Sequence, residues 1–420
     1  MSIEERNAYL TKRRWIVLAA CCVANLCIGA IYAWSVFAGP MAEHLNGLHG
    51  TALTAADLAI VFSIANGDAF ITTISGGYFD NKIGSRRVIL IGTVVFGLGF
   101  IVSGLASNVF LLIVGFSLMC GLGNGFAYVC TISTAVKFFP DKKGLAGGIS
   151  TAVFGISSVI IPPIADALNN SVGVCLAFII FGAVIVVLAV LCSLLIINCP
   201  DDFVPTGWTP PAESSRLPAV EDKNARQMLS APIFYVMLGM LTIGSTLGLM
   251  TISEASAAAQ SMVGMTASAA ALVVSALALF NTGGRIIAGW VSDHIGRINT
   301  LAGVFVLAVA ALGLLYFSGG GGSAAMFCAG ICLIGLCYGA FMGVYPGFTS
   351  DQFGMKYSSL NYGIMFIGFS AGGIIGPLLM QSMFNSRGTY RPAFLAAAAF
   401  AAVGFALSFV YRALARRASR

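Results

Sequence analysis

Twelve long apolar runs constrain the fold of this chain more than any other feature of its sequence. They lie near residues 14–38, 55–79, 88–106, 109–136, 145–168, 172–198, 232–257, 267–291, 299–318, 323–349, 358–384 and 391–413. Each run is close to or above the roughly 20 residues with which a helix crosses a bilayer. Helices suit lipid because they satisfy their backbone hydrogen bonds internally. The runs therefore predict an all-α, polytopic membrane protein with twelve transmembrane helices.

The few charged residues are distributed unevenly. They make up 9% of the chain, against roughly 25% in soluble domains, and this excludes a water-soluble fold. Two basic residues, Arg387 and Arg391, fall in a connection on one side of the predicted membrane, and Arg285 lies inside a span. The other nineteen fall in the loops and termini on the opposite side: Arg6, Lys12, Arg13, Arg14, Lys82, Arg86, Arg87, Lys137, Lys142, Lys143, Arg216, Lys223, Arg226, Arg297, Lys356, Arg412, Arg416, Arg417 and Arg420. The positive-inside rule then predicts two cytoplasmic termini in a multi-pass protein of the cell inner (plasma) membrane. The net charge of +6 is a topology signal and indicates no nucleic-acid partner.

The chain divides into two halves that resemble each other. A proline-containing segment of mixed charge, residues 199–231, separates residues 1–198 from residues 232–420 and has the composition of a cytoplasmic linker. Short motifs recur at offsets of 210 to 213 residues: Gly77, Asn81 and Gly84 match Gly289, Asp293 and Gly296; Asp141 and Gly144 match Asp351 and Gly354; Gly155 and Ser157 match Gly368 and Ser370. Secondary transporters form a central site between two such duplicated bundles. We therefore expect two pseudo-symmetric six-helix bundles.

Two of these motifs carry a family resemblance over essentially the whole chain. GYFDNKIGSRR at 77–87 and GWVSDHIGR at 289–297 resemble the cytoplasmic loop motif of the major facilitator superfamily. The resemblance implies a gating role for its matched residues, which are Gly77, Asn81, Gly84, Arg86, Gly289, Asp293, Gly296 and Arg297. The first copy departs from the motif, because Asn81 stands where the acid is expected and Asp80 comes one place early. That departure weakens a simple salt-bridge gate in the first copy.

Other segments resemble one group within this superfamily. KFFPDKKGLAGGISTAVFG at 137–155 is similar to a signature shared by monocarboxylate transporters and oxalate/formate antiporters. AIYAWSVFAGP at 30–40 and NTGGRIIAGWVSD at 281–293 resemble their first and eighth spans. The resemblance implies a bacterial lactate/proton symporter of this group.

Arg285 is the principal candidate for substrate binding. A permanent cation within a span costs several kcal/mol unless it is paired or hydrated, and a guanidinium fits a carboxylate in a bidentate manner. The alternative is a fixed ion pair with an intramembrane acid such as Asp68. In the resembling family the arginine at this position binds the substrate carboxylate. Asn281 lies one turn earlier on the same face, where it would orient Arg285 or bind a substrate hydroxyl.

The absence of a second cation favours a singly charged substrate. Oxalate/formate antiporters carry a lysine in the eleventh span, and Phe369 stands at the matching position here. Further candidates for lining the site, mostly from alignment to that family, are Tyr128, Tyr338, Tyr32, Phe366 and Asn66. Hydrogen bonding or packing between helices is the competing interpretation for the tyrosines and for Asn66.

Asp68 and Glu254 are the candidates for proton coupling. Asp68 lies near the middle of the second run, where burial favours the neutral, protonated carboxyl. A static hydrogen-bonded acid, or a counter-ion to Arg285, is the alternative. Glu254 is nearer the outer end of its span, where a solvated vestibule residue is the competing interpretation.

The sequence contains no pattern of catalytic or metal-binding residues. Its 11 cysteines lie mostly inside apolar runs and its three histidines lie in loops, so we expect no metal, no cofactor and no enzymatic activity. We predict a monomeric secondary transporter that moves small monocarboxylates such as lactate or pyruvate with protons, by alternating access. An anion exchanger of the oxalate/formate kind is the main alternative, and a channel or a sensor is the rival from another class.

Overall fold

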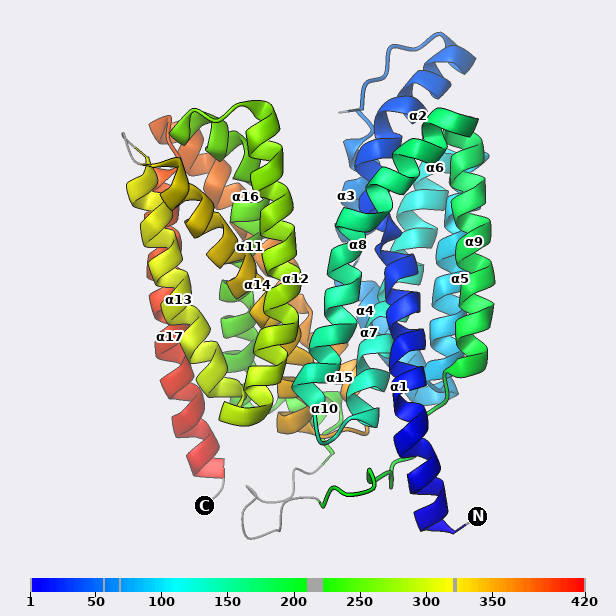
Figure 1. The fold of residues 1–420 in the computed structure, drawn as a ribbon, viewed down its shortest axis with the longest axis vertical. Coiled ribbons are helices and arrows are strands. Elements are labelled where there is room, and N and C mark those ends of the chain that lie inside the picture. The colour runs from blue at the N-terminus through cyan, green and yellow to red at the C-terminus, as the bar shows by residue number, and fades with distance from the viewer. Residues whose placement is uncertain (1, 56, 68, 210–221, 320–322, 419–420) are drawn as a thin grey trace. The chain divides into compact units, whose positions relative to one another are not determined.

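The computed structural model describes residues 2–55, 57–67, 69–209, 222–319 and 323–418, and these form helices and connections without any strand. Eleven helices are long and apolar enough to cross a membrane, or twelve when α3 and α4 are counted as one span. The prediction of an all-α polytopic protein is confirmed. The helices fall into two compact units, which are described separately below (Figure 1).

Unit 1 comprises residues 1–141, 153–209 and 357–364. Its first span is far longer than its apolar run, because the helix continues without interruption from Ile3 to His49. Phe37 lies in its core, stacked on Phe178 with the ring centroids 4.1 Å apart. Its helices are α1 (Ile3–Ile28), η1 (Gly29–Ala33), α2 (Trp34–His49), α3 (Ala59–Gly67), α4 (Ala69–Ile83), α5 (Ser85–Gly104), α6 (Val109–Leu112), η2 (Ile113–Met119), α7 (Cys120–Phe138), most of α8 (Lys143–Val172), α9 (Val174–Leu195) and most of α15 (Ser358–Met365).

Unit 2 comprises residues 142–152, 210–356 and 365–420. It takes in the first turns of α8 and then α10 (Ala225–Leu229), α11 (Pro232–Val263), α12 (Ala267–Ile295), α13 (Arg297–Ser318), α14 (Ala324–Phe353), α16 (Ile367–Arg387) and α17 (Arg391–Ala418). α13 and α17 pack side by side (Figure 1). The units thus differ from the expected halves by two short segments, 142–152 and 357–364, each of which packs with the unit formed mainly by the other half of the chain.

Two glycine turns show the internal repeat in the backbone. Gly84 joins α4 to α5 with φ +84° and ψ +151°, and Gly296 joins α12 to α13 with φ +87° and ψ +150°. A positive φ of this size is costly for any residue with a Cβ. Glycine at both positions therefore has the same structural reason, a tight turn between consecutive helices.

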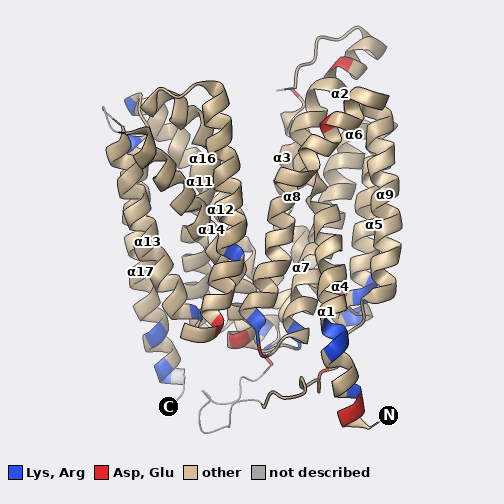
Figure 2. Ribbon diagram, viewed as in Figure 1, with Lys and Arg blue, Asp and Glu red and all other residues tan. Residues whose placement is uncertain are grey.

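The basic residues gather at one end of the helices in each unit, as Figure 2 shows. In unit 2 a smaller group of basic residues lies at the opposite end, in agreement with the two basic residues that the sequence assigns to the other side. This segregation is the arrangement on which the topology prediction depends.

Candidate functional site

Arg285 lies in α12 with only 5% of its surface exposed. Its Nη1 donates a hydrogen bond of 2.7 Å to the backbone carbonyl of Thr151 in α8. Its Nε donates one of 3.3 Å to the side-chain oxygen of Asn281, one turn earlier. Both acceptors are uncharged, and within the described part of the chain no carboxylate forms an ion pair with Arg285. The guanidinium thus retains N–H groups, and no carboxylate of a described residue balances its charge, so both are available to bind an anion.

The backbone of Arg285 is held in place by close packing on glycines. Gly339 and Gly343 of α14 lie so close to α12 that an added Cβ would stand 2.0 Å from the carbonyl oxygen of Asn281 and 2.2 Å from that of Arg285. Gly148 of α8 approaches the Arg285 carbonyl oxygen in the same way, at 2.4 Å. No side chain fits at these contacts, so the three glycines fix the position of this segment of α12.

Tyr128 and Tyr32, both in unit 1, contact the same residue. The ring of Tyr128 lies 4.8 Å from that of Phe154 in α8, and the ring of Tyr32 lies 5.5 Å from it. Tyr128 is buried, with 5% of its surface exposed. The structure therefore brings these two predicted residues together around Phe154.

The other predicted lining residues lie in different surroundings. In unit 2, the buried Tyr338 packs directly on Gly248 of α11, where an added Cβ would stand 2.3 Å from the ring. Phe366 lies between α15 and α16 and stacks on Phe369 at 4.4 Å. Asn66 is exposed and donates to the carbonyl of Phe62 in its own helix.

The two proton-coupling candidates differ in what the structure shows of them. Asp68 lies outside the described residues. Glu254 is half-buried in α11 and accepts a hydrogen bond of 3.0 Å from the hydroxyl of Tyr390. Burial, reinforced by the hydrogen bond to Glu254, raises the pKa of Tyr390 to about 12. Tyr390 therefore remains a donor to Glu254 throughout the physiological pH range.

The second copy of the loop motif forms a charge network in unit 2. Asp293 accepts hydrogen bonds of 2.8 Å from the backbone N–H groups of Gly144 and Leu145 at the start of α8, and it pairs with Arg297 at 2.7 Å. A carboxylate at a helix N-terminus satisfies donors that the helix cannot. Gly289 makes the contact close, since an added Cβ would stand 2.2 Å from the carbonyl oxygen of Gly144. This copy therefore attaches the start of α8 to α12.

The first copy uses Asp80 as its acid. Asp80 is buried, accepts a hydrogen bond from the hydroxyl of Ser359 and lies 3.9 Å from the ammonium of Lys137. Asn81, the residue aligned to the motif acid, is exposed. Gly77 again permits a close approach, because an added Cβ would stand 2.5 Å from the Cα of Leu360.

The two remaining residues of the first copy lie at the turn into α5. Gly84 occupies the turn itself, and Arg86 is exposed, with its backbone N–H bonded to the side chain of Asn198. The guanidinium of Arg86 forms no ion pair with any described residue. The described contact of Arg86 at this turn is therefore made by its backbone, and the gating role that the resemblance implies for it stays a prediction.

We expect Asp80→Asn to destabilise the protein and Asn81→Ala to leave its stability unchanged. Removing the buried carboxylate leaves Lys137 with less compensation, which costs roughly 3 kcal/mol in comparable cases. An exposed asparagine contributes within about 0.5 kcal/mol. Thermal unfolding of the two purified variants in detergent measures the difference. Equal midpoints would show that Asp80 is not the structural acid of this motif.

Sequence reasoning missed three neighbours of the predicted residues, and two of them, Thr151 and Phe154, had no signal in the sequence. Thr151 binds Arg285 through its backbone carbonyl, which carries no information about residue type. Phe154 is one of 30 phenylalanines. Lys143 pairs with Asp351 at 2.8 Å, and Asp351 belongs to the repeat, so the duplication could have indicated that charge pair. Among the described residues no group of three or more His, Cys, Asp or Glu side chains could hold a metal.

Comparison with known proteins identifies the family. The sequence profile of the Major Facilitator Superfamily matches residues 19–354 and 255–420. The chain is 26% identical to an uncharacterised MFS-type transporter, YhjX, of Escherichia coli, over 86% of each protein. It is 28% identical to the oxalate:formate antiporter of Oxalobacter formigenes, over 95% of this chain and 91% of that protein. It is 25% identical to human monocarboxylate transporter 11, over 96% and 83% respectively.

A solved structure supports the same fold. The crystal structure of the MFS transporter FucP in the outward conformation superposes with a TM-score of 0.69 at 18% identity, over 97% of this chain and all of that one. These matches and the set of membrane-spanning helices show a multi-pass membrane transporter and no enzyme. The chain belongs to the Major Facilitator Superfamily.

Proposed function

We propose that the protein transports small monocarboxylates such as lactate or pyruvate together with protons, by alternating access. The observation that carries this proposal is the buried Arg285, whose described partners are both neutral oxygens. A charge that remains uncompensated at such a position is costly unless a ligand or water balances it. A carboxylate supplies that balance with two acceptor oxygens in the geometry of the guanidinium fork.

Selectivity for one negative charge is supported by the residue that stands where the antiporters carry a second cation. The resemblance to oxalate/formate antiporters matches their lysine with Phe369, which stacks on Phe366 in the structure. An aromatic pair offers no charge to a second carboxylate. A dicarboxylate would therefore leave one carboxylate without a cationic partner, which is costly in an apolar site.

Coupling to a proton is supported by the energetics of anion entry. Bringing one negative charge into a cell against 100 mV costs about 2.3 kcal/mol, and a proton that enters with it cancels this electrical cost. Arginine cannot donate that proton, because it remains charged at any physiological pH. We propose Asp68 as the proton carrier and Glu254 as the second candidate.

Uptake into proteoliposomes tests the proposal. Labelled lactate should accumulate in empty vesicles when an inward proton gradient is imposed, and a protonophore should abolish the accumulation. Acetate, pyruvate, formate and oxalate in the same assay define the substrate class, and oxalate should be the poorest competitor. Saturable counterflow of lactate distinguishes a carrier from a channel.

An anion exchanger is the second candidate, because the antiporter of Oxalobacter formigenes aligns over 95% of this chain. Exchange needs no protonatable side chain. Uptake that occurs only into vesicles preloaded with formate or another monocarboxylate, and does not respond to a proton gradient, would replace symport by exchange. Arg285 would keep its proposed role in either case.

We expect substitution of the proton carrier to separate accumulation from exchange. Asp68→Asn should abolish proton-driven accumulation of lactate and leave lactate-lactate exchange largely intact, because exchange carries the substrate without a net proton movement. Glu254→Gln, which keeps an acceptor for Tyr390, should alter both by less than about twofold, as expected of a substitution that preserves the hydrogen bond. If Glu254→Gln abolished proton-driven accumulation and Asp68→Asn retained it, the coupling role would pass to Glu254.

A further inference from the structure

A short segment after α9, residues 198–206, lies across the basic end of unit 1, and we call it the strap. Figure 1 shows the chain leaving α9 and passing beside the first turns of α1. The side-chain oxygen of Asn198 accepts a hydrogen bond of 3.1 Å from the backbone N–H of Arg86 in α5. The thiol of Cys199 donates one of 3.5 Å to the backbone carbonyl of Lys137 in α7. The strap therefore contacts two helices of unit 1 before it reaches α1.

One aromatic side chain anchors the strap. Phe203 is buried, and its ring lies 5.7 Å from that of Phe138 at the end of α7. Burial of a phenylalanine ring is among the largest apolar contributions that a single side chain makes. The strap thus has a defined place on unit 1 and does more than join two helices.

The contacts of the strap with α1 are polar and exposed. Nη2 of Arg6 pairs with Oδ2 of Asp202 at 2.5 Å, and 31% and 60% of the two side chains are exposed. The backbone N–H of Thr206 donates a hydrogen bond of 3.0 Å to the hydroxyl oxygen of Thr11. An exposed ion pair is weak and is screened by salt. This side of the strap can therefore open without the loss of a buried charge pair.

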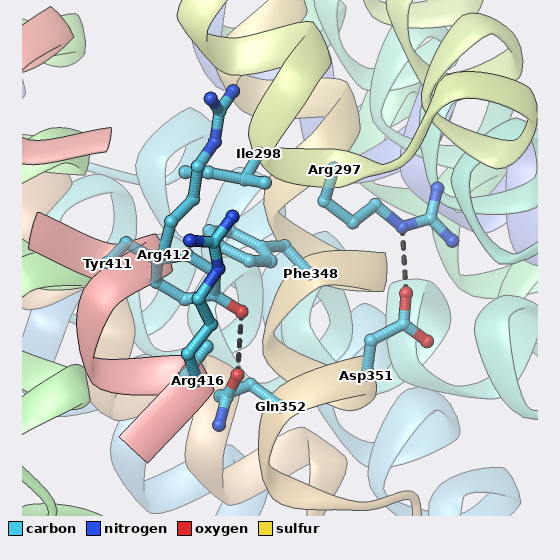
Figure 3. A pocket seen from close by; sticks show the side chains of 9 residues that line it. Arg297, Ile298, Phe348, Asp351, Gln352, Tyr411, Arg412 and Arg416 are labelled. Carbon is cyan, nitrogen blue, oxygen red and sulfur yellow. Dashed lines mark hydrogen bonds and ion pairs between the residues drawn. The ribbon is translucent and has the colours of Figure 1, made fainter. Parts of the chain in front are cut away.

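A second ion pair at the same end of unit 1 is better shielded from salt. Arg14 of α1 binds Asp141, which follows α7, through both Nη atoms at 2.7 and 3.2 Å, and both side chains are largely buried. Asp351 matches Asp141 in the repeat and is paired with Arg297 in unit 2 (Figure 3). Salt screens such pairs much less than exposed ones. It should therefore act mainly on the strap and leave α1 joined to the end of α7.

The connection to which the strap belongs is also fixed at its far end. In unit 2, the side-chain oxygen of Asp222 accepts hydrogen bonds of 2.8 and 3.0 Å from the backbone N–H groups of Met355 and Lys356. The length of chain between the two fixed ends depends on whether the strap is docked. Each residue that is released adds up to about 3.5 Å to the reach of this connection.

We propose that the strap docks reversibly on unit 1 and that ionic strength controls its docking through Arg6 and Asp202. At low ionic strength the pair holds the strap against α1, and Phe203 and Cys199 stay covered. At high ionic strength the pair is screened and the released fraction rises. Release lengthens the connection between the two halves of the chain. The strap would thereby regulate the movement of the halves in the proposed alternating access, and this consequence rests on the proposed function.

Cys199 provides a probe of the docked state. Burial raises the pKa of its thiol to about 12, and alkylation requires the thiolate. Release exposes the thiol and brings its pKa towards the ordinary value, so the rate of modification by N-ethylmaleimide follows the released fraction. Peptide mass spectrometry of the full-length protein in neutral detergent distinguishes Cys199 from the other cysteines. This measurement does not depend on transport, so it can succeed or fail independently of lactate uptake.

The experiment compares modification rates in about 20 mM and about 500 mM sodium chloride, between which the screening length falls severalfold. Cys199 of the wild type should react about two- to fivefold faster at high salt, as expected when an exposed ion pair is screened. D202N should react at the faster rate at both salt concentrations, because it has no pair to screen. F203A, which removes the buried anchor, should react about tenfold faster or more, even at low salt.

D201N is the matched control. Asp201 is exposed, precedes Asp202 and, like it, raises the pKa of Cys199, but it forms no ion pair with any described residue. D201N should therefore keep the slow rate, within about twofold, and its salt dependence. The charge-exchanged variant R6D/D202R should restore slow modification at low salt. Thermal unfolding shows whether each variant is folded.

Three results would overturn the proposal. A wild-type rate that does not respond to salt, or a salt dependence that persists in D202N, would remove the control by Arg6 and Asp202. Equal acceleration in D201N and D202N would assign the effect to the electrostatic potential at the thiol. An unchanged rate in folded F203A would show that the strap is not docked through Phe203.

Discussion

Replacing Arg285 by lysine should lower the specific rate of lactate uptake by about 10- to 100-fold, although the charge is preserved. The reason is geometric. A guanidinium can bind a carboxylate through two parallel N–H groups while it keeps its hydrogen bonds to Thr151 and Asn281, whereas an ammonium binds as a point charge. Losing one charge-assisted hydrogen bond costs about 1.5–3 kcal/mol. Initial rates over a range of lactate concentrations in proteoliposomes measure the effect. Arg285→Gln, which also removes the charge, should abolish uptake.

The matched control for this prediction is Arg387→Lys. Arg387 is exposed at the end of α16, so the same substitution there should leave uptake unchanged. Thermal unfolding in detergent shows whether each variant is folded. Full transport by folded Arg285→Lys would exclude bidentate recognition of the carboxylate at Arg285. Loss of transport in both variants would instead indicate a general effect of exchanging arginine for lysine.

The spans were predictable because hydropathy reports contact with lipid. The expected run 299–318 is α13, Arg297–Ser318, within two residues. The same signal fails where a helix leaves the lipid. The first helix begins at Ile3, where Ser2 and Glu5 form a capping box. Its first turns contain charged and polar residues, so hydropathy does not indicate that they are part of the helix. Helix length and apolar length are therefore different quantities at the ends of a bundle.

Irregularities within the spans were not predictable from the sequence. Residues Ile113–Met119 form a π-helix and Gly29–Ala33 form a 3-10 helix. Such departures depend on how the surrounding helices pack, since the same residues are compatible with a regular α-helix. The break at Phe366 between α15 and α16 is of the same kind. It contains no proline, the residue that usually marks a kink.

Contacts within one helix could be predicted from the sequence, whereas the burial of a particular side chain could not. Arg285 and Asn281 stand four residues apart on a helix, so their contact follows from helical geometry, and the structure shows it. Asp80 shows the limit of alignment, because a shift of one residue turns a helical side chain by about 100°. That rotation separates the buried Asp80 from the exposed Asn81. The motif predicts the position of an acid, and packing decides which residue supplies it.

The sequence does not show which glycines lie at close contacts between helices, and the structure does. The chain has 50 glycines, and hydropathy treats them alike. Gly283 and Gly284 are adjacent, and Gly284 directly precedes Arg285. An added Cβ at Gly284 would stand 2.2 Å from the carbonyl oxygen of Leu336 in α14, whereas one at Gly283 would meet nothing within 4 Å. Only the structure distinguishes the two.

We therefore expect Gly284→Ala to abolish transport and Gly283→Ala to leave it intact. The obstacle at Gly284 is backbone and cannot rotate away, so α12 must move from α14 and carry Arg285 with it. Overpacking of this kind costs about 1–3 kcal/mol. At Gly283 the new methyl group adds helix propensity, worth about 1 kcal/mol. Thermal unfolding should accordingly show a lower midpoint for Gly284→Ala and an equal or higher one for Gly283→Ala, with lactate uptake following the same order.

Gly339→Ala extends the test to the facing helix. A Cβ at position 339 would meet the carbonyl oxygen of Asn281 in α12. This substitution in α14 should therefore displace α12 and abolish uptake, although the sequence of α12 is unchanged. If Arg285 tolerated displacement, Gly284→Ala and Gly339→Ala would be less stable and still transport lactate at the normal rate. A fall in transport greater than the fall in folded protein would instead show that recognition depends on where the glycines hold the guanidinium. Because an arginine side chain is long and adaptable, this comparison measures how far the rigidity of the site resides in the backbone of α12 rather than in the side chain that binds the substrate.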